Sequence, residues 1–148
     1  MTFYRLEQFS APLLFDYLRL RTDVFVVEQG CAYPELDEWD REAEHLLAFE
    51  GQVLVACARI MGPHTIYPEP SLGRLAVARP YRHQGWGLRC LHACLERLQT
   101  RYPRQAIKIQ AQQYLEEFYA LAGFRSISPV PYADAGVMHV DMWLEAGR

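Results

Sequence analysis

Residues 75–88, LAVARPYRHQGWGL, decide the fold of this chain. A mainly apolar run at residues 72–78 predicts a strand that ends inside this stretch. Leucines spaced at i, i+3, i+7 and i+10 from Leu88 predict an amphipathic helix over residues 85–101. A strand therefore turns directly into a long helix, with two glycines at the turn.

This turn can hold an anionic phosphate. The first backbone N–H groups of a helix lack internal partners and lie at the positive end of the helix dipole. Gly85 and Gly87 let the backbone approach a ligand closely. A Walker A loop would need Gly-Lys-Ser/Thr here, and a Rossmann turn would need glycine where residue 90 is cysteine. A glycine-rich helix start without a ligand is the alternative interpretation.

Strands and helices are predicted along the rest of the chain. Ser10 can cap a first helix, and residues 24–27 either continue it or start a second turn. Gly51 predicts a tight hairpin, and Gly123 stops a helix over residues 112–122. Further strands are expected at residues 2–9, 45–50, 52–61, 106–111, 124–127 and 138–144, and loops at 30–44 and 62–71 and around Pro129, Pro131 and Gly136.

The order of these elements predicts a mixed α/β fold in one domain, residues 1–148. Hairpins in the first half indicate antiparallel pairing, and alternating strands and helices in the second half indicate parallel pairing with crossovers. We expect a twisted, mostly antiparallel sheet of about six to seven strands with helices on both faces.

Composition narrows the function. The 148 residues are 51% hydrophobic and 22% charged, which is typical of a globular domain. The net charge of -3 disfavours a nucleic-acid partner. The N-terminus lacks the pattern of a secretory signal, and no apolar run approaches the ~20 residues of a membrane span. A cytoplasmic protein without a membrane partner is expected.

The four cysteines match no common zinc pattern. On the predicted helix Cys90 and Cys94 share a side, whereas His92 points nearly opposite. We therefore expect buried thiols and no metal site.

Two motifs together resemble one enzyme family. The pattern V-x-x-x-x-R-x-x-G-x-G at residues 77–87 is similar to the central signature of the GNAT superfamily of N-acetyltransferases. The pattern Y-x-x-x-G-F at residues 119–124 resembles its second signature, about 35 residues later, the room that one βαβ-like step needs. The segments 20–29, LRTDVFVVEQ, and 136–142, with Met138 in place of a proline, resemble the ElaA-like branch, as do Cys31, Tyr33, Asp37, Asp40 and residues 45–47 between them.

The resemblance implies acetyl-CoA as co-substrate, no metal, and a pair of parallel strands that splay apart to admit it. The strand would contact the acetyl and pantetheine arm through Leu75, Ala76 and Val77, and a main-chain N–H near Ala76 or Val77 would bind the oxyanion. Gln112 stands where many members carry asparagine, and the resemblance implies that it could hydrogen-bond the pantetheine arm. The pyrophosphate cradle would comprise Arg82, His83, Gln84, Gly85, Trp86, Gly87, Leu88 and Arg89.

Tyr119 is the expected general acid. A phenol with a pKa of about 10 is protonated at neutral pH and can donate to a thiolate whose pKa is about 8.5. Taken alone, the helix pattern also fits a core tyrosine, since Tyr119 shares a side with Leu115 and Ala122. In the GNAT superfamily, which the chain resembles, the corresponding hydroxyl lies near the CoA sulfur.

The amine must lose a proton before or during attack, because only about one lysine-like amine in a thousand is neutral at pH 7. Candidates for the base, or for other acceptor-side roles, are Glu28, Asp37, His45 and His139. Three of them also have a structural alternative: Glu28 can cap a helix or pair with an arginine, His45 can be a hydrogen-bonded core residue, and Asp37 can be solvated. The acidic segment 35–44 could steer a cationic amine.

The sequence thus predicts an acetyl-CoA-dependent N-acetyltransferase. A primary amine, on a small molecule or a peptide, would attack the thioester directly in a ternary complex. The alternative is a non-catalytic acyl-CoA-binding or regulatory module of the same fold. A homodimer is compatible with the sequence, although nothing in it requires one.

Overall fold

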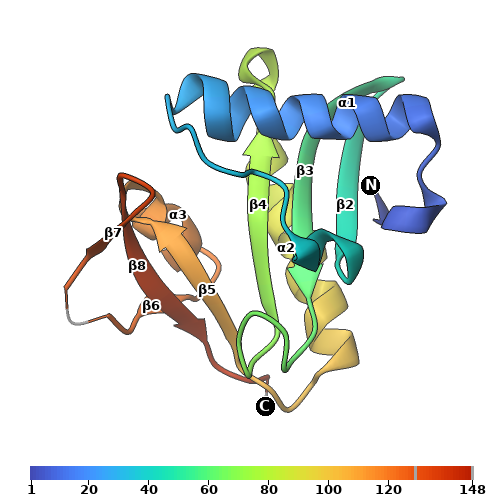
Figure 1. Ribbon diagram of the computed structural model, residues 1–148. Helices are drawn as coiled ribbons and strands as arrows, with labels where there is room; N and C mark the ends of the chain where they lie inside the picture. Colours follow the sequence, from blue (N-terminus) through green and yellow to red (C-terminus); the bar gives the residue numbers. More distant parts are fainter. Residues whose placement is uncertain (129, 148) are drawn as a thin grey trace.

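The computed structural model describes residues 1–128 and 130–147. Its strands form two antiparallel sheets (Figure 1). Sheet A has the order β1 (Thr2–Arg5), β2 (Glu44–Glu50), β3 (Val53–Met61) and β4 (Ser71–Val77). In sheet B, β8 (Val137–Leu144) pairs with β5 (Ile107–Gln112), β6 (Arg125–Ser126) and β7 (Tyr132–Asp134).

The two sheets meet at β4 and β5, which run in the same direction and diverge (Figure 1). At their narrow end the backbone N–H of Lys108 donates to the carbonyl of Pro70 at 3.1 Å. Helix α2 (Trp86–Arg101) is the crossover between the two strands. This is the expected mixed arrangement with a splayed parallel pair.

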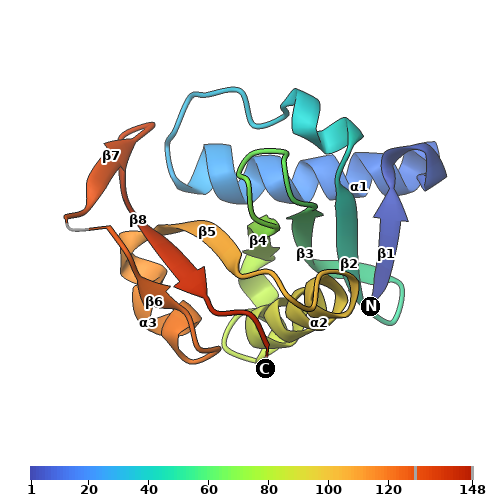
Figure 2. The ribbon, with the colours of Figure 1, turned by 90° about the horizontal axis from the view of Figure 1, so that it is seen from below.

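Helices cover the sheets unequally (Figure 2). Helix α1 (Ala11–Thr22) packs on one face of sheet A, against Leu47, Cys57 and Ala76. Helix α2 packs on the opposite face and shares one core with residues of both sheets. Because α1 covers only sheet A, the corresponding face of sheet B is left open.

Alternation in β5 gives sheet B one apolar face and one polar face. Ile107, Ile109 and Ala111 lie in the core under α2. Gln110 and Gln112 point to the other face, where both line a cavity. The chain thus turns a polar surface toward the gap between the sheets.

The helices begin and end largely where the sequence predicts. The Ser10 hydroxyl accepts a hydrogen bond from the N–H of Leu13 at 3.3 Å, which caps α1. The helical run then continues through a wider π-helical turn, Asp23–Glu28. A 3-10 turn, Gln113–Leu115, leads into α3 (Glu116–Ala120), and Gly123 has a φ of +97°.

Several predicted segments differ from the structure. Strand β1 ends at Arg5, not at residue 9, because the Gln8 side chain accepts the Arg5 N–H at 2.7 Å and starts the 3-10 turn Leu6–Gln8. The loop 30–44 contains a second 3-10 turn, Glu38–Arg41. Strand β6 is shorter than residues 124–127.

Strand β7 lies where a loop was predicted. The hairpin to β8 turns at Ala135 and Gly136, whose φ angles of +50° and +78° suit a tight two-residue turn. Alanine is unusual at positive φ, so the residue pattern did not reveal the turn. The predicted loop position Pro129 lies outside the described residues.

Candidate active site

Helix α2 begins without a side-chain cap. Its N-cap residue is Gly85, which has a φ of +83°. Because glycine has no side chain, no side-chain oxygen caps the helix. The first N–H bonded within this helical turn is that of Arg89, which donates to Gly85 at 3.1 Å. The N–H groups of Trp86, Gly87 and Leu88 precede it and have no partner inside the helix. The turn therefore fits a phosphate ligand of the kind that CoA carries.

Arg82 ties this turn to two neighbouring elements. Its Nε donates to the carbonyl of Val77 at the end of β4, at 2.9 Å. Its Nη2 donates to the carboxylate of Glu28 at 2.8 Å. Glu28 is thus paired with an arginine. This is the structural alternative to a base role that the sequence left open.

Strand β4 contains a β-bulge above the gap between the sheets. Arg59 of β3 faces Gly73, whereas Cys57 faces Ala76, so β4 carries one extra residue between these pairs. Arg74 has a φ of +50°, and both Arg74 and Leu75 line the cavity. The bulge turns the Arg74 side chain toward the cavity, which the sequence pattern did not predict.

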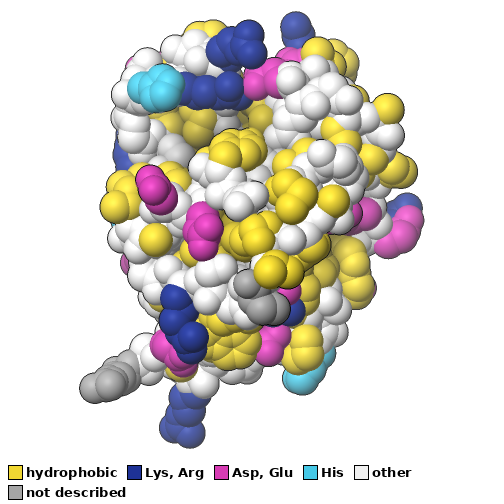
Figure 3. Space-filling view, turned by 90° about the vertical axis from the view of Figure 1, so that its left-hand side faces the viewer, with side chains coloured by type: hydrophobic (Ala, Val, Ile, Leu, Met, Phe, Trp, Pro, Cys, Tyr) yellow, Lys and Arg dark blue, Asp and Glu magenta, His cyan; other side chains and the backbone are white. Residues whose placement is uncertain are grey.

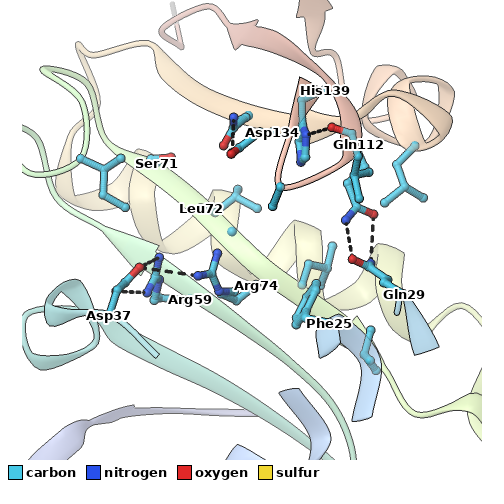
Figure 4. Close-up of a pocket in the computed structure, with 18 of the residues that line it drawn as sticks. Phe25, Gln29, Asp37, Arg59, Ser71, Leu72, Arg74, Gln112, Asp134 and His139 are labelled. Carbon is cyan, nitrogen blue, oxygen red and sulfur yellow. Dashed lines mark hydrogen bonds and ion pairs between the residues drawn. The ribbon is translucent and has the colours of Figure 1, made fainter. Parts of the chain in front are cut away.

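A cavity of about 410 Å³ lies between β4 and the polar face of sheet B (Figure 4). The predicted site residues that line it are Leu75, Gln112, Tyr119 and His139, together with the base candidate Asp37. Sequence reasoning did not single out other lining residues, among them Phe25, Gln29, Trp39, Arg59, Arg74, Gln110 and Asp134. Alternation in β5 could have indicated Gln110, because it shares a face with Gln112.

Tyr119 reaches this cavity from the short helix α3. Its side chain is buried, with Phe118 and Phe124 edge-on to the ring at centroid distances of 5.1 and 5.9 Å. Burial raises the pKa of the Tyr119 hydroxyl well above its ordinary value. The hydroxyl therefore stays protonated across the physiological range and can donate a proton.

His139 has its tautomer set by the backbone. Its Nδ1 lies 2.8 Å from the carbonyl oxygen of Val137, and a carbonyl can only accept a hydrogen bond, so Nδ1 carries the hydrogen. The ring of Tyr132 stacks on the imidazole, with 6.3 Å between the two ring centroids. In the neutral ring the lone pair is then on Nε2, which is the arrangement that a general base needs.

His45 lies in the core under α1. It is fully buried, and its pKa is lowered by that burial. Its Nε2 donates to the carbonyl of Asp40 at 2.9 Å, and its Nδ1 accepts from the Tyr17 hydroxyl at 2.6 Å. Both ring nitrogens are thus engaged, and His45 does not line the cavity.

Three acids of segment 35–44, Glu35, Asp37 and Asp40, are paired with arginines. Fully buried Arg21 contacts Glu35 at 2.8 Å and Asp40 at 2.7 Å. Arg59 contacts Asp37 at 2.7 Å and Asp40 at 3.0 Å. The expected steering of a cationic amine by this segment has to be revised, because these three carboxylates are neutralised at short range.

Asp40 lies at the centre of this arginine cluster. Burial alone would raise its pKa, but the hydrogen bond and charge of Arg21 and the charge of Arg59 lower the pKa to about 2. The carboxylate is therefore ionised at every physiological pH.

Gln112 is joined to the end of the helical run that begins with α1. The amides of Gln29 and Gln112 donate to each other at 3.3 and 3.2 Å (Figure 4). Gln112 also accepts from the Tyr114 hydroxyl. The side-chain amide of Gln112, which the resemblance assigns to the pantetheine arm, thus hydrogen-bonds Gln29 across the gap in this structure.

The thiols are mostly buried, as expected. Cys57, Cys90 and Cys94 are buried, whereas Cys31 is half-buried and donates to the carbonyl of Ala135 at 3.0 Å. Residues 1–128 and 130–147 contain no cluster of three or more His, Cys, Asp or Glu suited to a metal ion. None of the helices in these ranges is long and apolar enough to cross a membrane.

Comparisons with known proteins agree with this geometry. Residues 21–146 match the family described as "Acetyltransferase (GNAT) domain". The chain is 40% identical over 139 residues to UPF0039 protein sll0451 of Synechocystis, covering 93% of this chain and 90% of that one. It is 31% identical over 138 residues to protein ElaA of Escherichia coli, covering 92% and 90%.

Solved structures show the same fold. The crystal structure of Escherichia coli ElaA superposes with a TM-score of 0.88 at 29% identity, covering 97% of each chain. An acyl-CoA N-acyltransferase from Pseudomonas aeruginosa gives the same TM-score at 28% identity and the same coverage. A fold with a splayed strand pair and an uncapped turn beside it defines an acyl-CoA N-acyltransferase scaffold. The chain belongs to the GNAT acetyltransferase family, and ElaA and the UPF0039 proteins are among its relatives.

Proposed function

We propose that this protein transfers the acetyl group of acetyl-CoA to a primary amine, by direct attack within a ternary complex. The observation that carries the proposal is the meeting of three groups at one cavity: Leu75 of the β4 bulge, protonated Tyr119, and His139 with its lone pair on Nε2. These supply contact to the acyl arm, an acid and a base.

Each residue then has one task. The uncapped start of α2 binds the pyrophosphate, with Arg82 holding the turn in place. His139 Nε2 takes a proton from the amine as its nitrogen forms a bond to the thioester carbon. The C–S bond breaks as the tetrahedral intermediate collapses, and Tyr119 gives its proton to the departing thiolate. A backbone N–H of β4 near Ala76 or Val77 binds the oxyanion.

Two predicted acceptor-side residues take no part in this scheme. His45 has both ring nitrogens engaged in the core, and Glu28 is held by Arg82. Asp37 lines the cavity but is bound to Arg59, and we therefore assign the base role to His139, whose neutral ring has its lone pair on Nε2.

The assay measures acetylated product and CoA by chromatography after incubation with acetyl-CoA and an amine panel. We expect one class of amine to be acetylated, and Tyr119→Phe to lower kcat about 10²-fold without changing the KM for acetyl-CoA. The control Tyr102→Phe, at the far end of α2, should behave as wild type. If acetyl-CoA stabilises the fold but no amine is consumed, the chain is an acyl-CoA-binding module instead.

The cytoplasm remains the proposed location, and no nucleic-acid partner is proposed. A homodimer also stays a prediction. Figure 3 shows the side of the molecule that carries β6, β7 and β8, where hydrophobic side chains are spread over the surface. Exposed hydrophobic residues in this part of the chain include Leu121, Ile127, Val130 and Met138.

A further inference from the structure

The cavity has charged groups on two facing walls (Figure 4). On the sheet A side, Arg59 and Arg74 lie beside Asp37. On the sheet B side, Asp134 of β7 accepts a hydrogen bond from the Gln110 amide at 3.0 Å, near His139. The described lining thus contains two arginines and two carboxylates, which does not suit a ligand of one charge.

Arg59 and Arg74 are not equivalent. The Arg59 side chain is only 4% exposed, and its guanidinium is engaged by Asp37 and Asp40. The Arg74 side chain is 21% exposed, and its Nη2 donates to the backbone carbonyl of Glu35 at 3.1 Å. Its Nε is buried beside a Glu35 oxygen at 2.9 Å, so it does not reach the cavity. Its Nη2 also lies 3.6 Å from Asp37 Oδ2, which is beyond hydrogen-bond range, so the terminal nitrogens of the Arg74 fork keep N–H donors for a ligand.

The carboxylate next to Arg74 is already satisfied by other groups. Glu35 Oε1 accepts from Arg21 Nε at 2.8 Å, and Oε2 accepts from the Tyr33 hydroxyl at 2.7 Å. Arg74 can consequently turn part of its planar fork toward the cavity without leaving Glu35 unpaired. A guanidinium presented in this way matches the two oxygens of a carboxylate.

We infer that the acceptor is a carboxylate-bearing amine, such as a free amino acid, whose carboxylate binds Arg74. This rests on the proposed function and names its substrate class. The amino group faces the opposite wall, where Asp134 offers a negative charge and His139 a lone pair. A polyamine fits poorly, because it would bring a cation against Arg74.

The size and remaining lining of the cavity suit such a molecule. A volume of about 410 Å³ is in the range of small-molecule sites. Phe25, Met61, Ile66 and Leu72 give it apolar surface on which the rest of an amino acid can pack. The side chain of the acceptor would be selected by these residues, and its carboxylate by Arg74.

The test measures binding separately from turnover. Trp39 lines the cavity, so its fluorescence can report a ligand there, and Trp39→Phe should remove the signal. The CoA-loaded protein is titrated with the free L-amino acids and, for each one that binds, with its carboxamide, which lacks the negative charge. We expect the acid to bind about 10- to 100-fold more tightly than its amide.

Arg74→Gln should abolish this preference for the acid while leaving the weaker binding of the amide unchanged. Arg74→Lys keeps the charge but not the fork, and should retain part of the preference. The control Arg125→Gln, on an exposed arginine, should retain all of it. If wild type binds acid and amide equally, or if Arg74→Lys and Arg74→Gln both keep the full preference, the inference is overturned.

Turnover distinguishes this inference from the proposed function. Binding of the acid through Arg74, with no product from acetyl-CoA, would support the carboxylate site and overturn the transferase. Acetylation of simple amines as fast as of their amino acid counterparts would overturn the carboxylate site and leave the transferase standing.

Discussion

Glu28 and Arg82 form an ion pair of 2.8 Å, although 54 residues separate them in the chain. The pair joins the end of the first helical run to the turn before α2. We therefore expect Glu28 to hold the turn in place, and its removal to weaken co-substrate binding.

Glu28→Gln should raise the KM for acetyl-CoA severalfold and leave kcat nearly unchanged, because the loss affects the turn and not the reacting atoms. Steady-state kinetics with varied acetyl-CoA measure both constants. Arg82→Gln and the double variant complete a cycle whose effects should not add, since both remove the same pair. If kcat instead fell about 10²-fold while KM stayed unchanged, Glu28 would be assigned to proton transfer.

His139→Ala should lower kcat about 10²- to 10³-fold at pH 7, since the amine must then deprotonate without help. Raising the pH should restore the rate about tenfold per unit below the amine pKa, because the free base grows in that proportion. The exposed His92, changed to Gln, is the matched control. A His139→Ala enzyme with the wild-type rate and pH profile would show that the base lies elsewhere.

Asp40→Asn should lower the free energy of unfolding by about 3 kcal/mol at neutral pH, because it leaves Arg21 and Arg59 with a buried charge partly unpaired. The exposed pair of Asp23 with Arg19, broken by Asp23→Asn, should cost much less. Urea unfolding measures both variants.

The same aspartate predicts how stability responds to acid. Its pKa falls from an ordinary 3.8 to about 2 in the folded protein, so its contribution is complete above pH 3.8 and is lost as the pH falls toward 2. Wild type should therefore lose stability over this window, and Asp40→Asn should lack this part of the loss. Parallel slopes for the two proteins between pH 4 and 2 would contradict the assignment.

Gly85→Ala should destabilise the fold by about 1 kcal/mol, because the residue has a φ of +83° that alanine adopts only with strain. No atom lies within 4 Å of the added Cβ, so the cost is conformational and Gly85→Asn should reduce it. Gly73→Ala, also without close neighbours but at an ordinary φ, is the control for thermal unfolding. Equal melting temperatures for the two alanine variants would argue against the strain.

Local patterns were enough to predict the elements that position the co-substrate. The strand before residue 78, the long helix after Gly85 and the alternation at residues 106–111 all depend on neighbours in the chain, and the structure confirms them. The placement of Tyr119 in the cavity also agrees with its motif.

The acceptor side depended on contacts that no local pattern encodes. Arg21, Arg59 and Arg74 come from three different elements and meet segment 35–40 only after folding. The acids of that segment resemble solvated loop charges in the sequence, because their partners are far away along the chain. The bulge at Arg74 could not be predicted either, because the register of β4 depends on its pairing with β3.

The arginine cluster serves two purposes with the same atoms. Arg21 is as deeply buried as any core leucine, yet through Glu35 it supports Arg74, the residue that lines the cavity. A change on this wall is consequently a change to the core, and folding stability would select against most such changes. The opposite wall, the β7–β8 hairpin, has exposed side chains such as Asp134, so substitutions there should cost less folding stability than those around Arg21.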